Sequence, residues 1–98
     1  MDADYAAWIY VMKCDDHPEL VKVGLSRNPV RRAFDVRKKG ARLPVVEYAK
    51  QVSNPINIER KAHQSLRYCR AHGEWVKCTV TVATAAILDA TGSDHGVF

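Results

Sequence analysis

The apolar positions near the start of the chain fall into two short blocks separated by polar residues. Residues 6–13 are apolar almost without interruption, which predicts a central strand buried on both of its faces. The polar cluster at 14–19 contains a proline and is typical of an exposed turn. Residues 20–25 place an apolar side chain at every second position, which predicts a second strand. We therefore expect these two strands to form a hairpin.

Two Asn-Pro pairs predict the starts of two helices, because Asn caps a helix and Pro is tolerated at its first position. The first pair, Asn28-Pro29, predicts a helix that runs to about Lys39 and stops at Gly40. The side of this helix that faces the sheet is expected to consist of Val30, Ala33 and Phe34.

The second pair, Asn54-Pro55, opens an amphipathic pattern in a helical region that we expect to end at Gly73. Apolar residues recur there at helical spacing and predict a stripe buried against the sheet. The members of this stripe are Ile58, Ala62, Leu66 and Cys69.

The remaining segments predict one more strand and one more helix. Residues 43–52 carry valines and a tyrosine, and we expect an edge strand there because Pro44 cannot donate a hydrogen bond to a neighbour. Residues 74–76 are expected to add a short extended piece, and Thr81 to cap a helix over residues 82–90. The predicted fold is α+β, with a small three-stranded antiparallel sheet flanked by about three helices.

A chain of 98 residues is the size of one domain, so we expect a single domain over residues 1–98. Its core should cover about residues 6–90, and the polar tail 91–98 should fray. No apolar run approaches the roughly 20 residues of a membrane helix, and the first residues are acidic, unlike those of a signal peptide. We therefore expect a cytoplasmic protein with no membrane partner.

The three cysteines are an odd number at irregular spacings, which indicates free thiols in a reducing compartment. A zinc site is the alternative, but the spacing matches no familiar tight zinc knuckle. Its ligands would be Cys69, His72 and Cys78 with Cys14 or His63.

The chain has a formal net charge of +4, and the excess is concentrated in one segment. Residues 21–42 hold eight Lys and Arg against one acid, Asp35, which gives a local charge of +7. Such a segment favours a polyanion, because phosphate attraction supplies affinity without sequence choice; the alternative is a solvated helix face. The residues expected to contact nucleic acid are Arg27, Arg31, Arg37, Lys38 and Lys39.

Four side chains of complementary chemistry are interleaved with the apolar positions. A phenol, an amine, a guanidinium and a carboxylate can together handle a nucleophile, a phosphate and a divalent metal, which is what phosphodiester cleavage requires. His63 lies one helical turn after the carboxylate, at the edge of the buried stripe, and is a fifth candidate. The four are Tyr10, Lys22, Arg32 and Glu59.

Two triplets, Trp8-Ile9-Tyr10 and Lys22-Val23-Gly24, resemble the two halves of the signature of the GIY-YIG nuclease superfamily. The superfamily has an essential arginine eight residues after the second triplet, which is the position of Arg32 here. It also has a metal-binding glutamate on a later helix, which Glu59 matches. The resemblance covers about residues 6–88.

The chain departs from the signature at three positions. Trp8 replaces the first glycine, and Lys22 replaces the second tyrosine. Glu74 stands about fifteen residues after Glu59, where many members have an asparagine. Gly73-Glu74-Trp75 resembles an element of a small phage and bacterial branch that often has lysine in the second triplet. We expect Glu74 and Trp75 to be structural.

The resemblance implies an endonuclease that depends on Mg²⁺, with Mn²⁺ as a substitute, and hydrolyses DNA by in-line attack of water. Glu59 would hold a single metal ion, and Arg32 would hold the scissile phosphate with a planar fork. Lys22 is the preferred general base, and Tyr10 would orient the water. Either group could act as the base only if its pKa fell toward neutral, and Arg32 and the metal would lower the pKa of both. His63 would shuttle a proton or touch phosphate.

Other functions stay open on sequence alone. One is a catalytically inactive nucleic-acid-binding module on the same fold, and another is a structural domain in which Arg32 and Glu59 form a salt bridge. RNA as the substrate is also open. A stand-alone core without a reader module would need a second copy of itself to cut both strands, or another protein to direct it.

Overall fold

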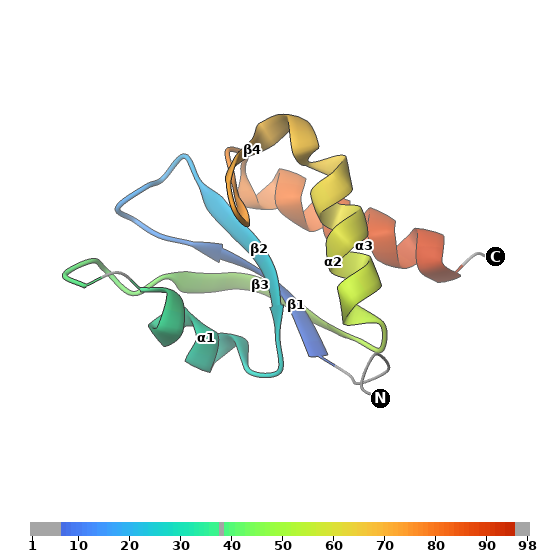
Figure 1. Cartoon of the computed structure of the whole chain (residues 1–98), viewed down its shortest axis with the longest axis horizontal. Helices are drawn as coiled ribbons and strands as arrows, with labels where there is room; N and C mark the ends of the chain where they lie inside the picture. Colours follow the sequence, from blue (N-terminus) through green and yellow to red (C-terminus); the bar gives the residue numbers. More distant parts are fainter. Residues whose placement is uncertain (1–6, 38, 96–98) are drawn as a thin grey trace.

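The structure is a computed structural model and describes residues 7–37 and 39–95. Within these residues, three helices accompany a five-stranded antiparallel sheet of order β3-β1-β2-β5-β4, which confirms the α+β class (Figure 1). The elements are β1 (Ala7–Lys13), β2 (Val21–Ser26), α1 (Pro29–Val36), β3 (Val45–Val52), α2 (Pro55–Ser65), a short 3-10 turn η2 (Arg67–Cys69), β4 (Arg70–His72), β5 (Trp75–Val76) and α3 (Val80–His95).

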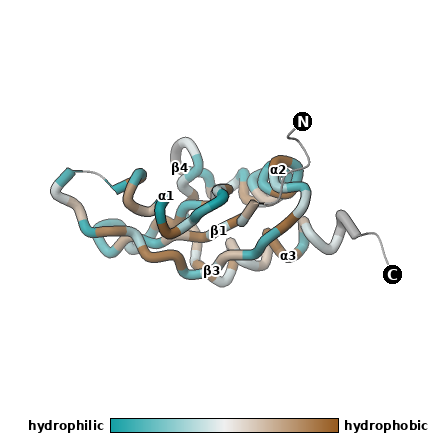
Figure 2. The backbone as a smooth tube through the Cα atoms, turned by 90° about the horizontal axis from the view of Figure 1, so that it is seen from below, coloured by the Kyte–Doolittle hydropathy of each residue, from teal (hydrophilic) through white to brown (hydrophobic). Residues whose placement is uncertain are grey.

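Strand β1 lies inside the sheet, between β2 and β3, as its continuous apolar sequence predicts. Ile9 and Val11 face one side and pack in a core with α2 and α3. Tyr10 and Met12 face the other side and pack near α1. The sheet is therefore covered on both faces, and Figure 2 shows the hydrophobic colour of β1 in the interior. Strand β3 is an edge strand, as Pro44 predicts.

Helix α1 starts as predicted, but it is shorter and is rotated about its own axis relative to the predicted orientation. The Asn28 side chain accepts a hydrogen bond from the Arg31 amide at 3.1 Å, which confirms the N-cap. The helix ends at Val36, before Lys39. Val30 and Phe34 are 66% and 56% exposed, so the expectation that they face the sheet is wrong. Ala33 is buried between the half-buried Arg32 and exposed Phe34.

The physical reason for this rotation is the small size of Ala33. Pro29, Ala33 and Val36 recur at helical spacing and form the side turned to the sheet, where a methyl group lets the helix backbone approach closely. One consequence concerns Arg32. It lies beside the buried stripe rather than opposite to it, so its side chain is half-buried next to the sheet.

The region after α2 differs from the prediction of one long helix. Ile58, Ala62 and Leu66 are buried as expected, but α2 ends at Ser65. The 3-10 turn η2 follows, and then β4 and β5 form a small hairpin whose turn contains Gly73 at φ 56°. This hairpin adds two strands to the three that the sequence predicts, and it brings residues 74–76 against β2.

Helix α3 begins earlier and ends later than predicted. The Thr79 hydroxyl accepts a hydrogen bond from the Val82 amide at 3.1 Å, so Thr79 caps the helix in place of Thr81. The helix continues to His95, and Thr91 is buried. Residues 91–95 therefore extend a helix that we expected to fray, and residues 96–98 lie outside the described part. Within that part, no helix is sufficiently long and apolar to span a bilayer.

Candidate active site

Strand pairing places two of the candidate side chains on the same face of the sheet. Met12 lies directly opposite Lys22, and Tyr10 lies directly opposite Gly24. Because paired residues in antiparallel strands point to the same side, Tyr10 and Lys22 both project toward the face covered by α1. Both side chains are buried, at 1% and 7% exposure. A lysine buried to this degree needs a partner for its charge.

Gly24 leaves the space that the Tyr10 side chain fills. A Cβ atom built on Gly24 would lie 2.5 Å from the Tyr10 hydroxyl oxygen and 2.8 Å from the ring carbon that bears it. Arg32 approaches the same point from α1, since its guanidinium is close enough to the Tyr10 hydroxyl to lower the pKa of the phenol. The glycine, the phenol and the guanidinium therefore meet at one place on the sheet.

The β4-β5 hairpin supplies the partner of Lys22. Trp75 pairs with Lys22 in the sheet, and the Val23 amide donates to the Glu74 carbonyl at 3.2 Å. The Lys22 ammonium donates to Glu74 Oε1 at 2.9 Å and lies 5.6 Å from the centre of the Trp75 ring. A cation above an aromatic face is favourable, so both neighbours stabilise the buried ammonium.

Helix α2 contributes the other two candidates at the edge of β2. The Val23 carbonyl accepts a hydrogen bond from His63 Nε2 at 2.7 Å, which ties α2 to β2. Glu59 lies one turn earlier, and its buried Oε2 atom accepts no hydrogen bond from any described residue. Its carboxyl group interacts with that of Glu74. Residues from five elements or their connections thus form the polar cluster, which comprises Tyr10, Lys22, Arg32, Glu59, His63 and Glu74.

The two carboxyl groups of the polar cluster have different proton affinities. Burial, followed by the hydrogen bond and the charge of Glu74, raises the pKa of Glu59 to about 7. Burial acts in the same direction on Glu74, but hydrogen bonds from Lys22 and Glu59 outweigh it and lower the pKa of Glu74. A protonated Glu59 that donates to an ionised Glu74 explains both directions.

The phenol does not behave as we expected. Burial raises the pKa of Tyr10, and the hydrogen bond from Arg32, which acts in the opposite direction, does not overcome it. Arg32 does act to lower the pKa of Tyr10, as expected, but burial of the almost fully enclosed ring outweighs it, so the net shift is upward. His63 uses Nε2 to hold Val23, so that nitrogen is occupied by a structural contact.

The polar cluster can accommodate a metal ion only through few protein ligands. Among residues 7–37 and 39–95, no three or more His, Cys, Asp or Glu side chains gather in a metal-binding arrangement. The buried, unpartnered oxygen of Glu59 beside a second carboxylate fits Mg²⁺, which prefers oxygen and keeps several waters. The three cysteines, Cys14, Cys69 and Cys78, are free thiols, as predicted.

Basic residues lie on two sides of the polar cluster. Arg27, Arg31, Arg37 and Lys39 are exposed, and Lys38 lies outside the described residues. A second basic surface was not predicted. It lines a groove of about 390 Å³ that also contains Glu59, His63 and Glu74. Its cationic members are Arg60, Arg67 and Arg70.

Glu74 is the residue of the cluster whose role the sequence did not indicate, since we expected it to be structural. The available signal was its position about fifteen residues after Glu59, where relatives of the resembled superfamily carry a polar residue. The interpretation that Arg32 forms a salt bridge with Glu59 is wrong. Within the described ranges, Arg32 contacts Tyr10 and no ion pair joins it to Glu59.

The fold and the polar cluster define a small α+β domain with cationic and carboxylate side chains gathered on one face of its sheet. The model of the T5orf172 domain family matches residues 7–90, and the chain belongs to this family. The family is linked to nuclease-like and DNA-binding proteins. No curated protein and no solved structure matches the chain.

Proposed function

We propose that the chain is an endonuclease of the GIY-YIG type that hydrolyses phosphodiester bonds in DNA with the help of Mg²⁺. One observation carries the proposal. Tyr10, Lys22, Arg32 and Glu59 come from four separate elements, yet the fold collects them beside one another through Gly24 and Glu74. Family membership supports the same class of function.

Arg32 is the group that would hold the scissile phosphate. Its guanidinium already lies at the Tyr10 hydroxyl, and among the described residues no carboxylate neutralises it. A planar guanidinium binds two phosphate oxygens at once and stabilises the charge that builds on them. The exposed Arg31 and Arg37 on the same side would contact neighbouring phosphates and add affinity without sequence choice.

Glu59 is the group that would hold the metal ion. A protonated carboxyl group must release its proton to become a ligand. The charge of the neighbouring Lys22, which acts to lower the pKa of Glu59, would favour that release. The bound Mg²⁺ would supply positive charge to a nonbridging phosphate oxygen and to the leaving oxygen. Glu74 lies against Glu59 and is the second carboxylate within reach of the same ion.

Lys22 is the preferred base, and Glu74 controls whether it can act. In this structure the ammonium form of Lys22 donates to Glu74. An amine must lose its proton before it can accept one from water, so catalysis requires that Glu74 give up this contact. Tyr10, with its raised pKa, stays protonated near neutral pH and can orient the attacking water through its hydroxyl.

The same ion pair favours a second candidate, a nucleic-acid-binding module on this fold that does not cut. If Lys22 stays bound to Glu74 when DNA is present, the cluster has a phosphate-binding Arg32 and no base. Binding without turnover in Mg²⁺ or Mn²⁺ would identify this function.

Nicking of supercoiled plasmid by the purified chain tests the proposal. We expect relaxation of the plasmid in Mg²⁺ or Mn²⁺ and none in EDTA. Glu59→Gln and Arg32→Ala should each abolish nicking while circular dichroism stays unchanged. Glu47→Gln changes an exposed carboxylate on β3 and should cut like the wild type.

Two results would contradict the nuclease assignment. The first is metal-dependent nicking that persists in folded Glu59→Gln protein, because the cutting would then come from another site or a contaminant. The second is salt-sensitive DNA binding with no cutting of plasmid or branched substrates, which would establish the binding module.

A further inference from the structure

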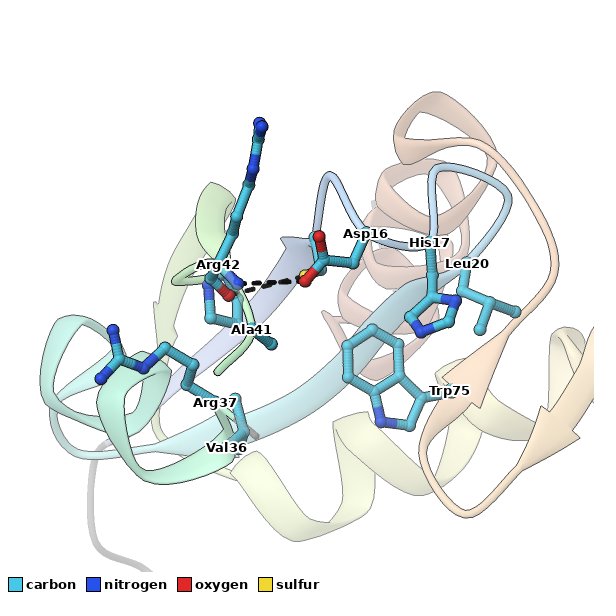
Figure 3. A pocket seen from close by; sticks show the side chains of 10 residues that line it. Asp16, His17, Leu20, Val36, Arg37, Ala41, Arg42 and Trp75 are labelled. Atoms are coloured by element: carbon cyan, nitrogen blue, oxygen red, sulfur yellow. Dashed lines mark hydrogen bonds between the residues drawn. The ribbon is translucent and has the colours of Figure 1, made fainter. Parts of the chain in front are cut away.

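A pocket outside the polar cluster opens between α1 and the turn that connects β1 to β2. Its volume is about 200 Å³. Leu20, His17 and Trp75 line one side, while Val36, Ala41 and Arg37 line the other (Figure 3). The size suits one ring system rather than a large ligand, since typical small-molecule sites exceed roughly 300 Å³.

This pocket, which we call the Trp75 pocket, lies on the same face of the sheet as the polar cluster. Trp75 is paired directly with Lys22, so the two side chains project to the same side. The ring of Trp75 lies under the Lys22 ammonium and also lines the pocket. Trp75 therefore connects the Trp75 pocket with the polar cluster, and a group bound in the pocket lies next to a ligand bound at Lys22.

The chemistry of the Trp75 pocket is apolar inside and cationic at its opening. Apolar or aromatic atoms of Leu20, Val36, Pro44 and Trp75 form the walls. Arg37 at the rim is exposed and makes no ion pair with any residue in the described ranges. The acidic lining residue Asp16 is already engaged, since Oδ2 accepts a hydrogen bond from the Arg42 amide at 3.0 Å (Figure 3).

We propose that the Trp75 pocket binds an unpaired nucleobase adjacent to the scissile phosphate, so that the substrate class is DNA with a displaced or unpaired nucleotide. The inference rests on the proposed function and specifies its substrate. The base stacks against the aromatic and aliphatic walls, and its phosphate lies at Arg37. A base that is already unpaired enters without the cost of opening a pair, which selects against perfect duplex.

The expected selectivity follows from stacking. Stacking of one base on an aromatic side chain is commonly worth about a tenfold change in affinity or more. We therefore expect the chain to bind a duplex with one extra unpaired adenine about tenfold more tightly than the matched perfect duplex. An otherwise identical bulge that carries an abasic nucleotide should bind like the perfect duplex, because it has the bend and lacks the base.

Fluorescence anisotropy with these three labelled duplexes tests the inference, in EDTA so that no strand is cut. Ala41→Trp fills the pocket without removing any core side chain, and should erase the preference for the adenine bulge while leaving perfect-duplex affinity unchanged. Trp75→Leu is the second variant, with folding checked by circular dichroism. Leu88→Trp adds the same ring on an exposed position of α3 and should keep the preference.

Equal affinity of the wild type for all three duplexes would overturn the inference, as would tight binding of the abasic bulge or a preference that survives in Ala41→Trp. These outcomes leave the nuclease proposal untouched, because cutting of plasmid and branched substrates in Mg²⁺ decides that separately. Conversely, a bulge preference in a protein that never nicks DNA would support the pocket and reject the nuclease.

Discussion

The Tyr10 hydroxyl lies in the space that a side chain at residue 24 would fill. A Cβ on Gly24 would come within 2.5 Å of that oxygen and within 3.0 Å of Glu74 Oε1. Residue 24 is therefore a glycine because the Tyr10 hydroxyl and Glu74 Oε1 occupy the space of a side chain. Tyr10 can reach Arg32 only because residue 24 has no side chain.

Gly24→Ala should lower the free energy of unfolding by about 1–3 kcal/mol, because a methyl group forced into a filled site displaces its neighbours. Urea unfolding followed by circular dichroism measures the change. In the double variant Tyr10→Leu/Gly24→Ala, the alanine should cost less than it does in the presence of Tyr10, because the ring end that it meets is gone. Gly92→Ala is the matched control, since its Cβ meets nothing within 4 Å. An unchanged urea midpoint in Gly24→Ala would show that the contact relaxes freely.

The raised pKa of Glu59 predicts a pH dependence of stability. Between about pH 4.5 and 7 the folded chain keeps a proton on Glu59 that the unfolded chain has lost. The free energy of unfolding should therefore fall as pH rises through this window, and level off above it. Glu59→Gln mimics the protonated form and should remove this part of the slope.

Urea midpoints of wild type and Glu59→Gln at pH 5 and pH 8 give the measurement, and the difference between the two proteins isolates Glu59 from the histidines. Glu74 has a lowered pKa, so it contributes to the pH dependence of stability only below this range. Its stabilisation is lost as the pH falls through that lowered pKa. Parallel pH profiles of the two proteins would reject a protonated Glu59.

Lys22→Met should slow plasmid nicking by about 100-fold or more if Lys22 is the base, since a positioned base contributes about 10²–10⁴ in rate. Lys77→Met removes an exposed lysine beyond β5 and serves as the control. Cleavage rates measured from pH 6 to 9 under single-turnover conditions test whether Lys22 is the base. Wild-type rates in Lys22→Met across that range would show that another group accepts the proton.

Arg32→Lys keeps the charge and removes the planar fork, so nicking should still fall by about 10²-fold if two phosphate oxygens are held at once. Arg31→Lys, on the exposed side of the same helix, should cut at close to the wild-type rate. DNA affinity in EDTA should change little in either variant. Equal activity of the two variants would mean that Arg32 acts only through its charge.

Much of the fold is predictable because it depends on neighbouring residues. The N-cap at Asn28, the hairpin of β1 and β2 and the buried face of α2 follow from short periodic patterns. The sheet-facing side of α1 does not, because Val30 and Phe34 satisfy the helical pattern as well as Ala33 does. Packing against the sheet selects the small residue, and the pattern contains no information about how closely the helix approaches.

The candidate site, like the fold, is only partly predictable from the sequence. Tyr10, Lys22, Arg32 and Glu59 could be named from their order and spacing. Strands of three and two residues carry no usable periodicity, so β4 and β5 were missed as a hairpin, and with them the role of Glu74. The proton on Glu59 depends on burial and on a carboxylate far along the chain, and neither is visible in the sequence around it.

The ion pair between Lys22 and Glu74 joins positions 52 residues apart, and the contact of His63 with Val23 spans 40. Closing loops of this length costs conformational entropy, which the contacts must offset. A chain that has left the ribosome only as far as residue 70 already contains Tyr10, Lys22, Arg32 and Glu59. It lacks the carboxylate that holds the Lys22 ammonium, so the polar cluster stays incomplete until the hairpin of β4 and β5 has been synthesised.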